Sequence, residues 1–360
     1  MICSDTPDIF SGSGHVQMVR VLIVGLGSSG TRHLKLAKQY LPNAEIRVFR
    51  PKRSNQIAKI DLEILTSEEA VVAFAPTIAI LANPSPFHID IANLLAKIGT
   101  HMLIEKPLSD SSSGVIEFLS LCEKNNIVVC VGYNLRFLPS LMVFQQYLSQ
   151  DIVGQVLSVH SVAGQYLPSW RPTIDYRESV SAQKILGGGV LLELSHELDY
   201  LQWIFGEVEW VSATLSKQSN LEIDVEDMAR ITMGINPKDS GHQIICSLDI
   251  DFIRKDHTRQ CLAIGETGTL RWDGISGTVD INNSTSNGWK TLFTDVTKID
   301  MTYRAEWEYF LQCVSEDQPP KVGAIDGLRV LEVIEAARQS SAASKKVFVN
   351  YSTKIQEEKI

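Results

Sequence analysis

An apolar strand that runs directly into a glycine-rich turn and a helix constrains the fold of this chain more than any other feature. Residues 19–30 read VRVLIVGLGSSG, and a helical pattern begins at Thr31. In such a segment the first glycine allows a tight turn, the second lets the backbone approach a pyrophosphate, and the third allows close helix–strand packing. A glycine-rich turn without a ligand is the alternative. We predict a dinucleotide-binding loop made of Gly25, Leu26, Gly27, Ser28, Ser29 and Gly30.

Short apolar runs alternate with helical patterns from about residue 18 to residue 132. The expected strands are 19–25, 45–50, 76–83, 100–105 and 126–133, and the expected helices are 31–41, 88–97 and 114–124. Alternation of strands and helices predicts a parallel sheet with right-handed crossovers. The first domain is therefore expected to be a doubly wound Rossmann domain over residues 18–132.

The periodicity changes after about residue 150. In HQIICSLDIDF the apolar residues stand at 244, 246, 248, 250 and 252, which is the alternation of a strand with one buried face. Similar runs at 154–164, 207–217, 228–235, 259–266 and 268–274 are its expected sheet partners. The predicted fold class is therefore α/β: an N-terminal Rossmann domain plus a C-terminal α+β domain (133–350) with a large, mostly antiparallel open sheet. Residues 1–17 are expected to be a disordered lead-in and 351–360 a polar tail.

Composition excludes several classes of protein. A chain of 360 residues is too long for one ordinary hydrophobic core. The net charge of −9 argues against nucleic acid or an anionic membrane as the main partner. No apolar run reaches the length of a membrane span, and the N-terminus lacks the pattern of a secretory signal. The six cysteines form no ligand-spaced cluster, so we expect a cytoplasmic protein without disulfides or a bound metal.

The residue that ends the second strand bears on the choice of coenzyme. A carboxylate at this point would bind the ribose 2′-hydroxyl of NAD, whereas this chain has Arg50, followed by Pro51, Lys52 and Arg53. Arginine suits a 2′-phosphate through a bidentate contact. The sequence thus favours NADP and leaves NAD open, with a solvated basic turn as the alternative.

Two short segments carry candidate catalytic side chains. In IEKPLSD (104–110) the proline after Lys106 holds this lysine out of helical geometry, and the Lys106–Pro107 bond can be cis. In GGGVLLELSHELDY (187–200) the residues Glu193, His196 and Asp199 recur every third position. On a helix expected over 187–205 they share one face with Tyr200, opposite Leu194, Leu198, Leu201 and Phe205. A solvated polar face is the ordinary alternative.

These motifs, taken in order, resemble the Gfo/Idh/MocA oxidoreductases. The resemblance rests on GLGSSGTRH, ANPSPFH, EKPLSD, VGYNLRF and GGGVLLELSHELDY, and it extends to GETGTLRWD, YRAEWEYF and DGLRVLEVIEAARQSS. It implies hydride exchange between nicotinamide and a carbinol carbon of a sugar, cyclitol or nucleotide sugar. It also implies an open C-terminal sheet that often forms the oligomer interface, hence a homodimer or homotetramer.

The resemblance also assigns roles to single residues. Lys106 corresponds to the lysine of the cleft and His196 to the catalytic histidine, while Asn83 and His88 flank the coenzyme. Glu105 joins the coenzyme-binding candidates and Asn134 the substrate-binding ones. The family commonly has Asp or Asn four residues before the histidine; this chain has Leu192 there and an acid at Glu193 instead. Glu193 is therefore a catalytic candidate whose role the shifted spacing puts in doubt.

The segment before the three glycines bears on the substrate. YLPSWRPTIDYRESVSAQKILGGG contains Trp170, Arg171, Tyr176 and Arg177. Guanidinium groups bind phosphate or carboxylate, and aromatic rings stack on sugar or base. We therefore predict a nucleotide sugar or sugar acid as substrate, held by Arg171, Tyr176 and Arg177. An ordinary surface loop is the alternative for this segment, and a non-catalytic dinucleotide sensor of the same fold is the alternative for the whole protein.

Overall fold

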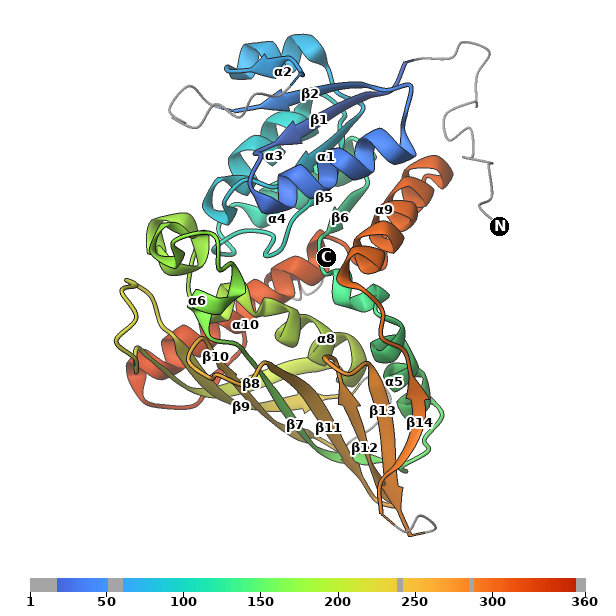
Figure 1. The fold of residues 1–360 in the computed structure, drawn as a ribbon, viewed down its shortest axis with the longest axis vertical. Helices are drawn as coiled ribbons and strands as arrows, with labels where there is room; N and C mark the ends of the chain where they lie inside the picture. The colour runs from blue at the N-terminus through green and yellow to red at the C-terminus, as the bar shows by residue number, and fades with distance from the viewer. Residues whose placement is uncertain (1–17, 51–60, 238–241, 285–287, 354–360) are drawn as a thin grey trace. The chain divides into compact units, whose positions relative to one another are not determined.

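The computed structural model describes residues 18–50, 61–237, 242–284 and 288–353 (Figure 1). The predicted lead-in 1–17, Cys3, Lys52 and Arg53 lie outside these ranges, as does the tail from residue 354 onward. The chain forms two compact units. The first comprises residues up to Gly132 together with Arg304–Leu328, and the second comprises Tyr133–Tyr303 and residues from Arg329 onward.

The first unit contains a six-stranded parallel sheet in the order β3-β2-β1-β4-β5-β6. Its strands are β1 (Arg20–Val24), β2 (Glu45–Phe49), β3 (Ile64–Leu65), β4 (Ile78–Leu81), β5 (His101–Ile104) and β6 (Val129–Val131). Its helices are α1 (Ser28–Tyr40), α2 (Glu68–Phe74), η1 (Ser85–Phe87), α3 (His88–Lys97) and α4 (Val115–Lys124). This strand order is that of a dinucleotide-binding Rossmann sheet, as predicted.

The central strands of this sheet are apolar on both faces because helices cover both. Val21, Leu22 and Ile23 of β1 and all four residues of β4 are fully buried. Such continuous apolar runs are typical of parallel strands. The positions of these strands could therefore be predicted from the sequence. The elements β3 and α2 were not predicted, since a strand of two residues and a helix of seven are too short for a clear periodic pattern.

The second unit is built on a nine-stranded sheet in the order β14-β13-β12-β11-β7-β10-β9-β8-β15. All neighbours are antiparallel except β10 and β7, which run parallel. The strands are β7 (Val156–Gly164), β8 (Glu207–Ser216), β9 (Met228–Asn236), β10 (Ile244–Asp251), β11 (Thr258–Gly265), β12 (Gly268–Asp273), β13 (Thr278–Asn283), β14 (Lys290–Thr294) and β15 (Val347–Phe348). The mostly antiparallel second sheet is confirmed.

One face of this sheet is covered and the other is open. Ile244, Cys246, Leu248 and Ile250 of β10 are buried, as the alternation predicted, and Phe252 just beyond the strand is buried too. Helices α5 (Pro139–Ser149), α7 (Val190–Glu193) and α8 (Ser195–Phe205) pack on this side of the sheet (Figure 1). Residues that alternate with the buried ones, such as the exposed Ile245, point to the opposite face.

The remaining elements are short helices before α7 and two long helices near the C-terminus. The short ones are η2 (Asn134–Phe137), α6 (Leu167–Trp170), η3 (Tyr176–Glu178), η4 (Val180–Ala182) and η5 (Lys184–Leu186). The long ones are α9 (Ile299–Glu316) and α10 (Ala324–Ala343). The expected second domain, 133–350, included all of α9, whereas the chain returns to the first unit over Arg304–Leu328. Helix α9 thus supplies residues to the Rossmann unit.

Candidate active site

The glycine-rich loop is shaped to receive a phosphate group. Gly25 has φ +84°, and a Cβ there would lie 3.0 Å from backbone atoms of Ala82 and Asn83. A Cβ on Gly30 would lie 2.2 Å from the carbonyl oxygen of Gly25, so the helix can approach only because this residue is glycine. By contrast, a Cβ on Gly27 would meet nothing within 4 Å. The loop is therefore closed toward the sheet and open on its outer side.

Helix α1 begins at this loop without a side chain that satisfies its first N–H groups. Its N-cap, Gly27, has no side chain, and the first turn contains no acidic residue. The unsatisfied N–H groups and the helix dipole favour an anion at this end. The Oδ1 atom of Asn83, after β4, is buried without a hydrogen-bond partner among the described residues. These features fit a dinucleotide.

His88 does not lie where the sequence placed it. Its side chain is 1% exposed, with Nε2 2.7 Å from the Asn83 carbonyl oxygen and Nδ1 3.2 Å from that of Leu108. Burial lowers the pKa of His88, although the two carbonyl contacts oppose this shift. A buried imidazole cannot touch a coenzyme, so His88 instead connects the segments that follow β4 and β5.

Glu105 and Lys106 follow β5 at the carboxyl edge of the sheet. The Lys106–Pro107 peptide bond is cis. Glu105 is 8% exposed, and its Oε1 lies 3.0 Å from Nε2 of His33 on α1. Burial alone would raise the pKa of Glu105, but hydrogen bonds from His33 and Ser29 and the charge of Lys106 hold it below its usual value. Glu105 is thus an anion tied to the phosphate loop.

Two buried residues of this unit that were not predicted as site residues, His33 and Trp307, adjoin Glu105. Trp307 Nε1 donates to Nδ1 of His33 at 2.7 Å, and both side chains are fully buried. His33 stands three residues after Gly30 in the GLGSSGTRH motif, so a polar residue on the sheet-facing side of α1 was the available signal. Trp307 gave no such signal, because its place beside His33 depends on where α9 packs.

Arg50 follows β2 directly, as predicted. Its backbone N–H donates to the carbonyl of Leu65 at 3.0 Å, which fixes the backbone at the end of the strand, and its side chain is half-buried. The basic residues that follow it lie outside the described ranges. This position, at the end of the second strand, is where a residue can contact the ribose of the coenzyme.

In the second unit, the helix expected over 187–205 is divided in two. Helix α7 ends at Glu193, Leu194 leaves helical geometry with φ −98° and ψ 26°, and α8 starts at Ser195. Within residues 191–200 only Glu193 and His196 are partly exposed. The two titratable side chains that the sequence proposed for catalysis are therefore the ones that can reach a ligand.

The prediction of a polar helix face that also includes Asp199 and Tyr200 is wrong. Asp199 is 1% exposed and accepts a bidentate pair from Arg136, with Nη2 at 2.6 Å and Nε at 3.0 Å. The Tyr200 hydroxyl lies 2.6 Å from Ser161 Oγ, and its ring meets Trp272 edge to face. Both residues anchor α8 to its own unit.

Glu197, next to His196, is equally enclosed. It is fully buried, and its Oε1 receives Nη2 of Arg259 at 2.8 Å and Nε at 3.0 Å. Two arginine–carboxylate pairs thus fix the helix that carries His196. The imidazole itself meets the edge of the buried Tyr133 ring, with the centroids 5.7 Å apart and the planes at 78°.

Asn134 is not placed to bind a substrate. Its side chain is 2% exposed, and its Nδ2 donates to Thr302 Oγ1 at 2.9 Å. This bond ties η2 to the start of α9 within the second unit. The sequence could not separate this structural role from a binding role, because the partner stands 168 positions later.

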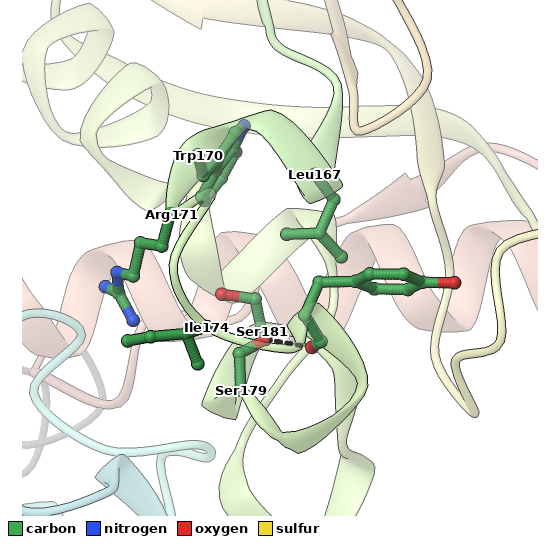
Figure 2. A pocket seen from close by; sticks show the side chains of 7 residues that line it. Leu167, Trp170, Arg171, Ile174, Ser179 and Ser181 are labelled. Atoms are coloured by element: carbon green, nitrogen blue, oxygen red, sulfur yellow. Dashed lines mark hydrogen bonds between the residues drawn. The ribbon is translucent and has the colours of Figure 1, made fainter.

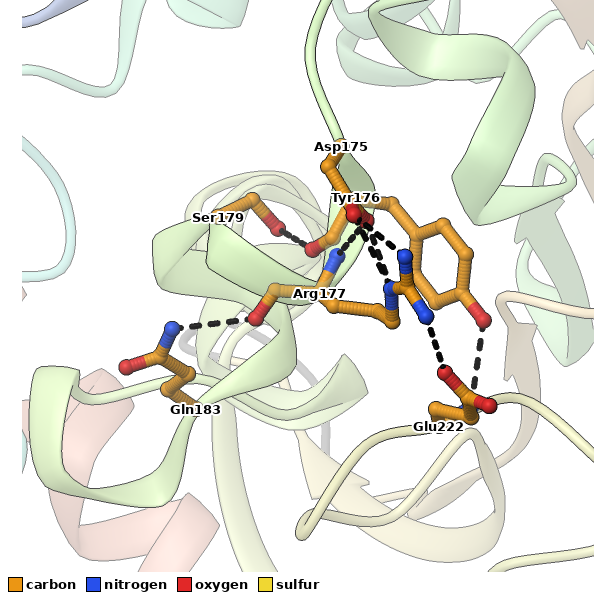
Figure 3. A network of polar contacts seen from close by, with 6 residues as sticks. All are labelled: Asp175, Tyr176, Arg177, Ser179, Gln183 and Glu222. Atoms are coloured by element: carbon orange, nitrogen blue, oxygen red, sulfur yellow. Dashed lines mark hydrogen bonds and ion pairs between the residues drawn. The ribbon is translucent and has the colours of Figure 1, made fainter.

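The loop between β7 and α7 contains the predicted substrate residues, and most of their polar groups are already engaged (Figure 3). Arg177 pairs with Asp175, Nη2 to Oδ2 at 2.6 Å, and with Glu222, Nη1 to Oε2 at 2.6 Å. The Tyr176 hydroxyl accepts from the backbone N–H of Glu222 at 3.2 Å. Arg177 and Tyr176 therefore stabilise the loop, and the expectation that they hold a substrate gains no support.

Arg171 differs from Arg177. Its guanidinium makes no hydrogen bond or ion pair with any residue that the structure describes, and it lines a small pocket in the loop (Figure 2). The other lining residues are Leu167, Trp170, Ile174, Tyr176, Ser179 and Ser181. Trp170 is anchored by its Nε1, which donates to the Gln165 carbonyl at 3.0 Å, and by an edge contact with Phe252. Of the two arginines predicted to hold the substrate, Arg171 is thus the one whose donors no described residue engages.

The described part of the chain contains no metal site, no disulfide and no helix that could span a membrane. There, His, Cys, Asp and Glu side chains form no group of three that could hold a metal ion. The five cysteines in these ranges, namely 122, 130, 246, 261 and 313, are free and buried. Among the same residues, no helix has the length and apolar character needed to cross a bilayer.

Two protein-family models match most of the chain. One, described as the oxidoreductase family with an NAD-binding Rossmann fold, matches residues 19–133. The other, described as the C-terminal alpha/beta domain of that oxidoreductase family, matches residues 145–349. Together they cover the parallel sheet and the large second sheet. The first part thus has the NAD-binding Rossmann fold and the second the C-terminal alpha/beta domain of the same family.

Similar proteins of known name span nearly the whole chain. Myo-inositol 2-dehydrogenase of Thermotoga maritima is 22% identical over 346 residues, covering 91% of this chain and 98% of that protein. Levoglucosan dehydrogenase in complex with NADH has a TM-score of 0.79 at 19% identity and covers 93% of this chain and 100% of its own. The WlbA dehydrogenase of Bordetella pertussis with NADH and UDP-GlcNAcA has a TM-score of 0.76 at 19% identity, covering 93% and 99%. The two structures confirm the fold.

Proposed function

We infer that this chain, which belongs to the Gfo/Idh/MocA oxidoreductase family, transfers hydride between a nicotinamide coenzyme and a carbinol or keto carbon of a sugar derivative. The observation that carries this proposal is the phosphate loop, open at Gly27, on the same sheet edge as the anionic Glu105 and its neighbour Lys106. A bound nicotinamide would supply the hydride chemistry. The chain must then supply binding, orientation and a proton carrier.

His196 is the proposed proton carrier. An imidazole titrates in the physiological range, so it can take a proton from a hydroxyl or return it in the reverse direction. In this chain His196 is partly exposed on a helix held by two buried ion pairs. Lys106 is the proposed electrostatic partner of the developing oxyanion. Glu193, also partly exposed, stays a candidate for orienting the substrate or the imidazole.

The decisive experiment measures turnover and coenzyme binding in the same variants. Lys106→Ala and His196→Ala are each expected to lower kcat by about 100-fold or more while NAD(P) still binds, since general acid–base and oxyanion groups act in the transition state. Turnover is followed by NAD(P)H absorbance over free sugars, cyclitols and nucleotide sugars. Near-wild-type turnover in both variants would overturn the assignment.

A non-catalytic sensor of the same fold is the alternative. It would bind coenzyme tightly and reduce none of it across the whole substrate panel. The chain has both a partly exposed His196 in the second unit and the Lys106 motif in the first. This combination favours the enzyme, because a sensor needs no proton carrier.

For the coenzyme, the finer proposal is NADP rather than NAD. Arg50 directly follows the second strand, at a position where a guanidinium would pair with the 2′-phosphate. The NADH in the two neighbouring structures belongs to those proteins. Arg50→Asp should weaken NADP far more than NAD, measured as the two dissociation constants. An equal loss for both coenzymes, or a wild-type preference for NAD, would refute it.

For the substrate, we propose an anionic sugar derivative, a nucleotide sugar or a sugar acid. Arg171 supports this proposal, because its guanidinium is bound by no other described residue and it lies beside Trp170 in a pocket of the second unit. Arginine binds phosphate or carboxylate bidentately. The test compares kcat/KM for a nucleotide sugar and its free sugar in wild type and Arg171→Ala. The proposal fails if the neutral sugar is the better substrate, or if the substitution affects both equally.

Two expectations from the sequence stay proposals. The open face of the nine-stranded sheet is the proposed interface of a homodimer or homotetramer, and sedimentation of the purified chain would measure its mass in solution. A cytoplasmic location is proposed from the cysteine usage, since all five described cysteines are free.

A further inference from the structure

A row of three buried polar side chains links helix α9 to the coenzyme edge of the Rossmann sheet. Trp307 Nε1 lies 2.7 Å from His33 Nδ1, and His33 Nε2 lies 3.0 Å from Glu105 Oε1. Trp307 and His33 are fully buried and Glu105 is 8% exposed. All three belong to the first unit, although Trp307 follows Glu105 by about 200 positions along the chain.

The donor chemistry of this row permits one arrangement of protons. An indole nitrogen is a donor only, so Nδ1 of His33 must accept and cannot itself carry a proton. The remaining ring proton is then on Nε2, which donates to the Glu105 carboxylate. The structure therefore assigns His33 as the neutral Nε2–H tautomer, set by its second hydrogen bond.

The surroundings of Trp307 hold its N–H in place. The Tyr40 ring stacks on the indole, with the ring centroids 6.4 Å apart and the planes at 10°. The Tyr40 hydroxyl donates to Glu308 Oε1 at 2.7 Å. Arg304 of α9 donates to Gln39 Oε1 of α1 at 2.8 Å. These contacts fasten α9 to α1 on both sides of Trp307.

The residue before Trp307 on α9 gives an independent observation. Glu306 is 2% exposed, and neither carboxyl oxygen has a hydrogen-bond partner among the described residues. Burial, and then the charge of Glu105, raise the pKa of Glu306 well above its usual value. Glu306 is therefore kept neutral, and α9 places no second negative charge against Glu105.

We propose that Trp307 and His33 are positioning residues for Glu105, which hold its carboxylate in a fixed orientation beside Lys106 for coenzyme binding. This inference rests on the proposed coenzyme site and adds to it a segment of α9. Although burial opposes the shift, the hydrogen bonds from His33 and Ser29 and the charge of Lys106 lower the pKa of Glu105. Besides burial, the charge of Glu105 in turn raises the pKa of Glu306 on α9.

The first test reads the tautomer directly, with ¹⁵N-histidine NMR on the full chain without coenzyme. In the wild type, the His33 signals should show an unprotonated Nδ1 and a protonated Nε2, because the indole N–H of Trp307 donates to Nδ1. In Trp307→Phe the Nδ1 atom loses this hydrogen bond, so its ¹⁵N shift should move while Nε2 stays protonated. An Nδ1–H tautomer in the wild type, or the same Nδ1 shift in both proteins, overturns the inference.

The second test measures coenzyme affinity by calorimetry. Trp307→Phe should weaken NAD(P) by about fivefold, the usual effect of one lost hydrogen bond, and change kcat less than KM for coenzyme. Trp272→Phe is the matched control, because Trp272 is also fully buried and its Nε1 donates to Ser140 Oγ at 3.0 Å in the other unit. Equal weakening in both variants would mean a general packing effect and would overturn the inference.

A second pair of variants decides the matter if Trp307→Phe does not fold. His33→Gln keeps an N–H donor for Glu105 and His33→Leu removes it, at similar volume. We expect His33→Leu to bind coenzyme more weakly than His33→Gln, and equal affinities would contradict the role of His33. If the wild type bound neither NAD nor NADP, the proposed function itself would fail, a result distinct from all of these.

Discussion

Helices α8 and α9 both bury carboxylates, and they treat the charge in opposite ways. On α8, Asp199 and Glu197 are buried against Arg136 and Arg259, with contacts of 2.6–3.0 Å. On α9, Glu306 is equally buried and has no hydrogen-bond partner in the described residues. The first two carboxylates lie in ion pairs, whereas the third keeps its proton.

The difference follows from what each helix must do. A buried carboxylate either finds a cation or stays neutral, because an isolated charge in a low-dielectric interior is too costly. The ion pairs of α8 fix the helix that carries His196. On α9, an ionised Glu306 would repel Glu105, so neutrality there preserves the anion at the coenzyme edge. A buried carboxyl group thus fixes a helix where an arginine pairs with it, and it stays neutral where no cation is its partner.

The largest effect is expected when the cation that pairs with Asp199 of α8 is removed. Arg136→Met would leave Asp199 buried and uncompensated, which typically costs about 3–5 kcal/mol of unfolding free energy. Urea denaturation measures the loss. Arg136→Met combined with Asp199→Leu should recover most of it, because the apolar pair leaves no buried charge. A single variant as stable as the wild type would show that Asp199 does not depend on its arginine.

A smaller, pH-dependent effect is expected on α9. The folded chain holds the Glu306 proton to higher pH than the unfolded chain, so stability is fully present below the unfolded pKa and is lost as pH rises. Glu306→Gln cannot ionise and should avoid this loss. Its advantage should therefore grow with pH, by at most about 1.4 kcal/mol per pH unit.

Urea midpoints measured from about pH 5 to about pH 9 would test the Glu306 prediction. Glu316→Gln, at the exposed end of the same helix, is the matched control and should follow the wild type at every pH. If Glu306→Gln also follows the wild type, Glu306 ionises without penalty, and the contrast between the two helices disappears.

The smallest effect is expected where an ion pair is exposed. Asp175 and Glu222 bind Arg177 at the surface, and solvent screens such pairs. Asp175→Asn should leave global unfolding unchanged but speed hydrogen exchange at the Arg177 amide, which donates to Asp175 Oδ1 at 3.0 Å. A large change in the unfolding midpoint would show that this loop contributes to the core of its unit.

The sequence predicted well those elements whose pattern is local. The glycine loop, the parallel strands and the alternation of 244–252 depend on neighbours within a few residues, and all three are present. The division of 187–205 at Leu194 was missed because the glycines and leucines there fit one helix as well as two. Asn134 and His88 were misplaced because a buried amide or imidazole has the same sequence signal as an exposed one.

By itself, the sequence determined that a dinucleotide loop opens a parallel sheet, that a second sheet follows, and that Lys106 and His196 are candidates for the chemistry. Only the tertiary structure decided which charges are buried, paired or free. Arg171 and Arg177 look alike in the sequence, yet Arg177 alone finds two carboxylates. Trp307 reaches His33 because α9 returns to the first unit. Burial and pairing depend on residues far apart along the chain, which no local pattern records.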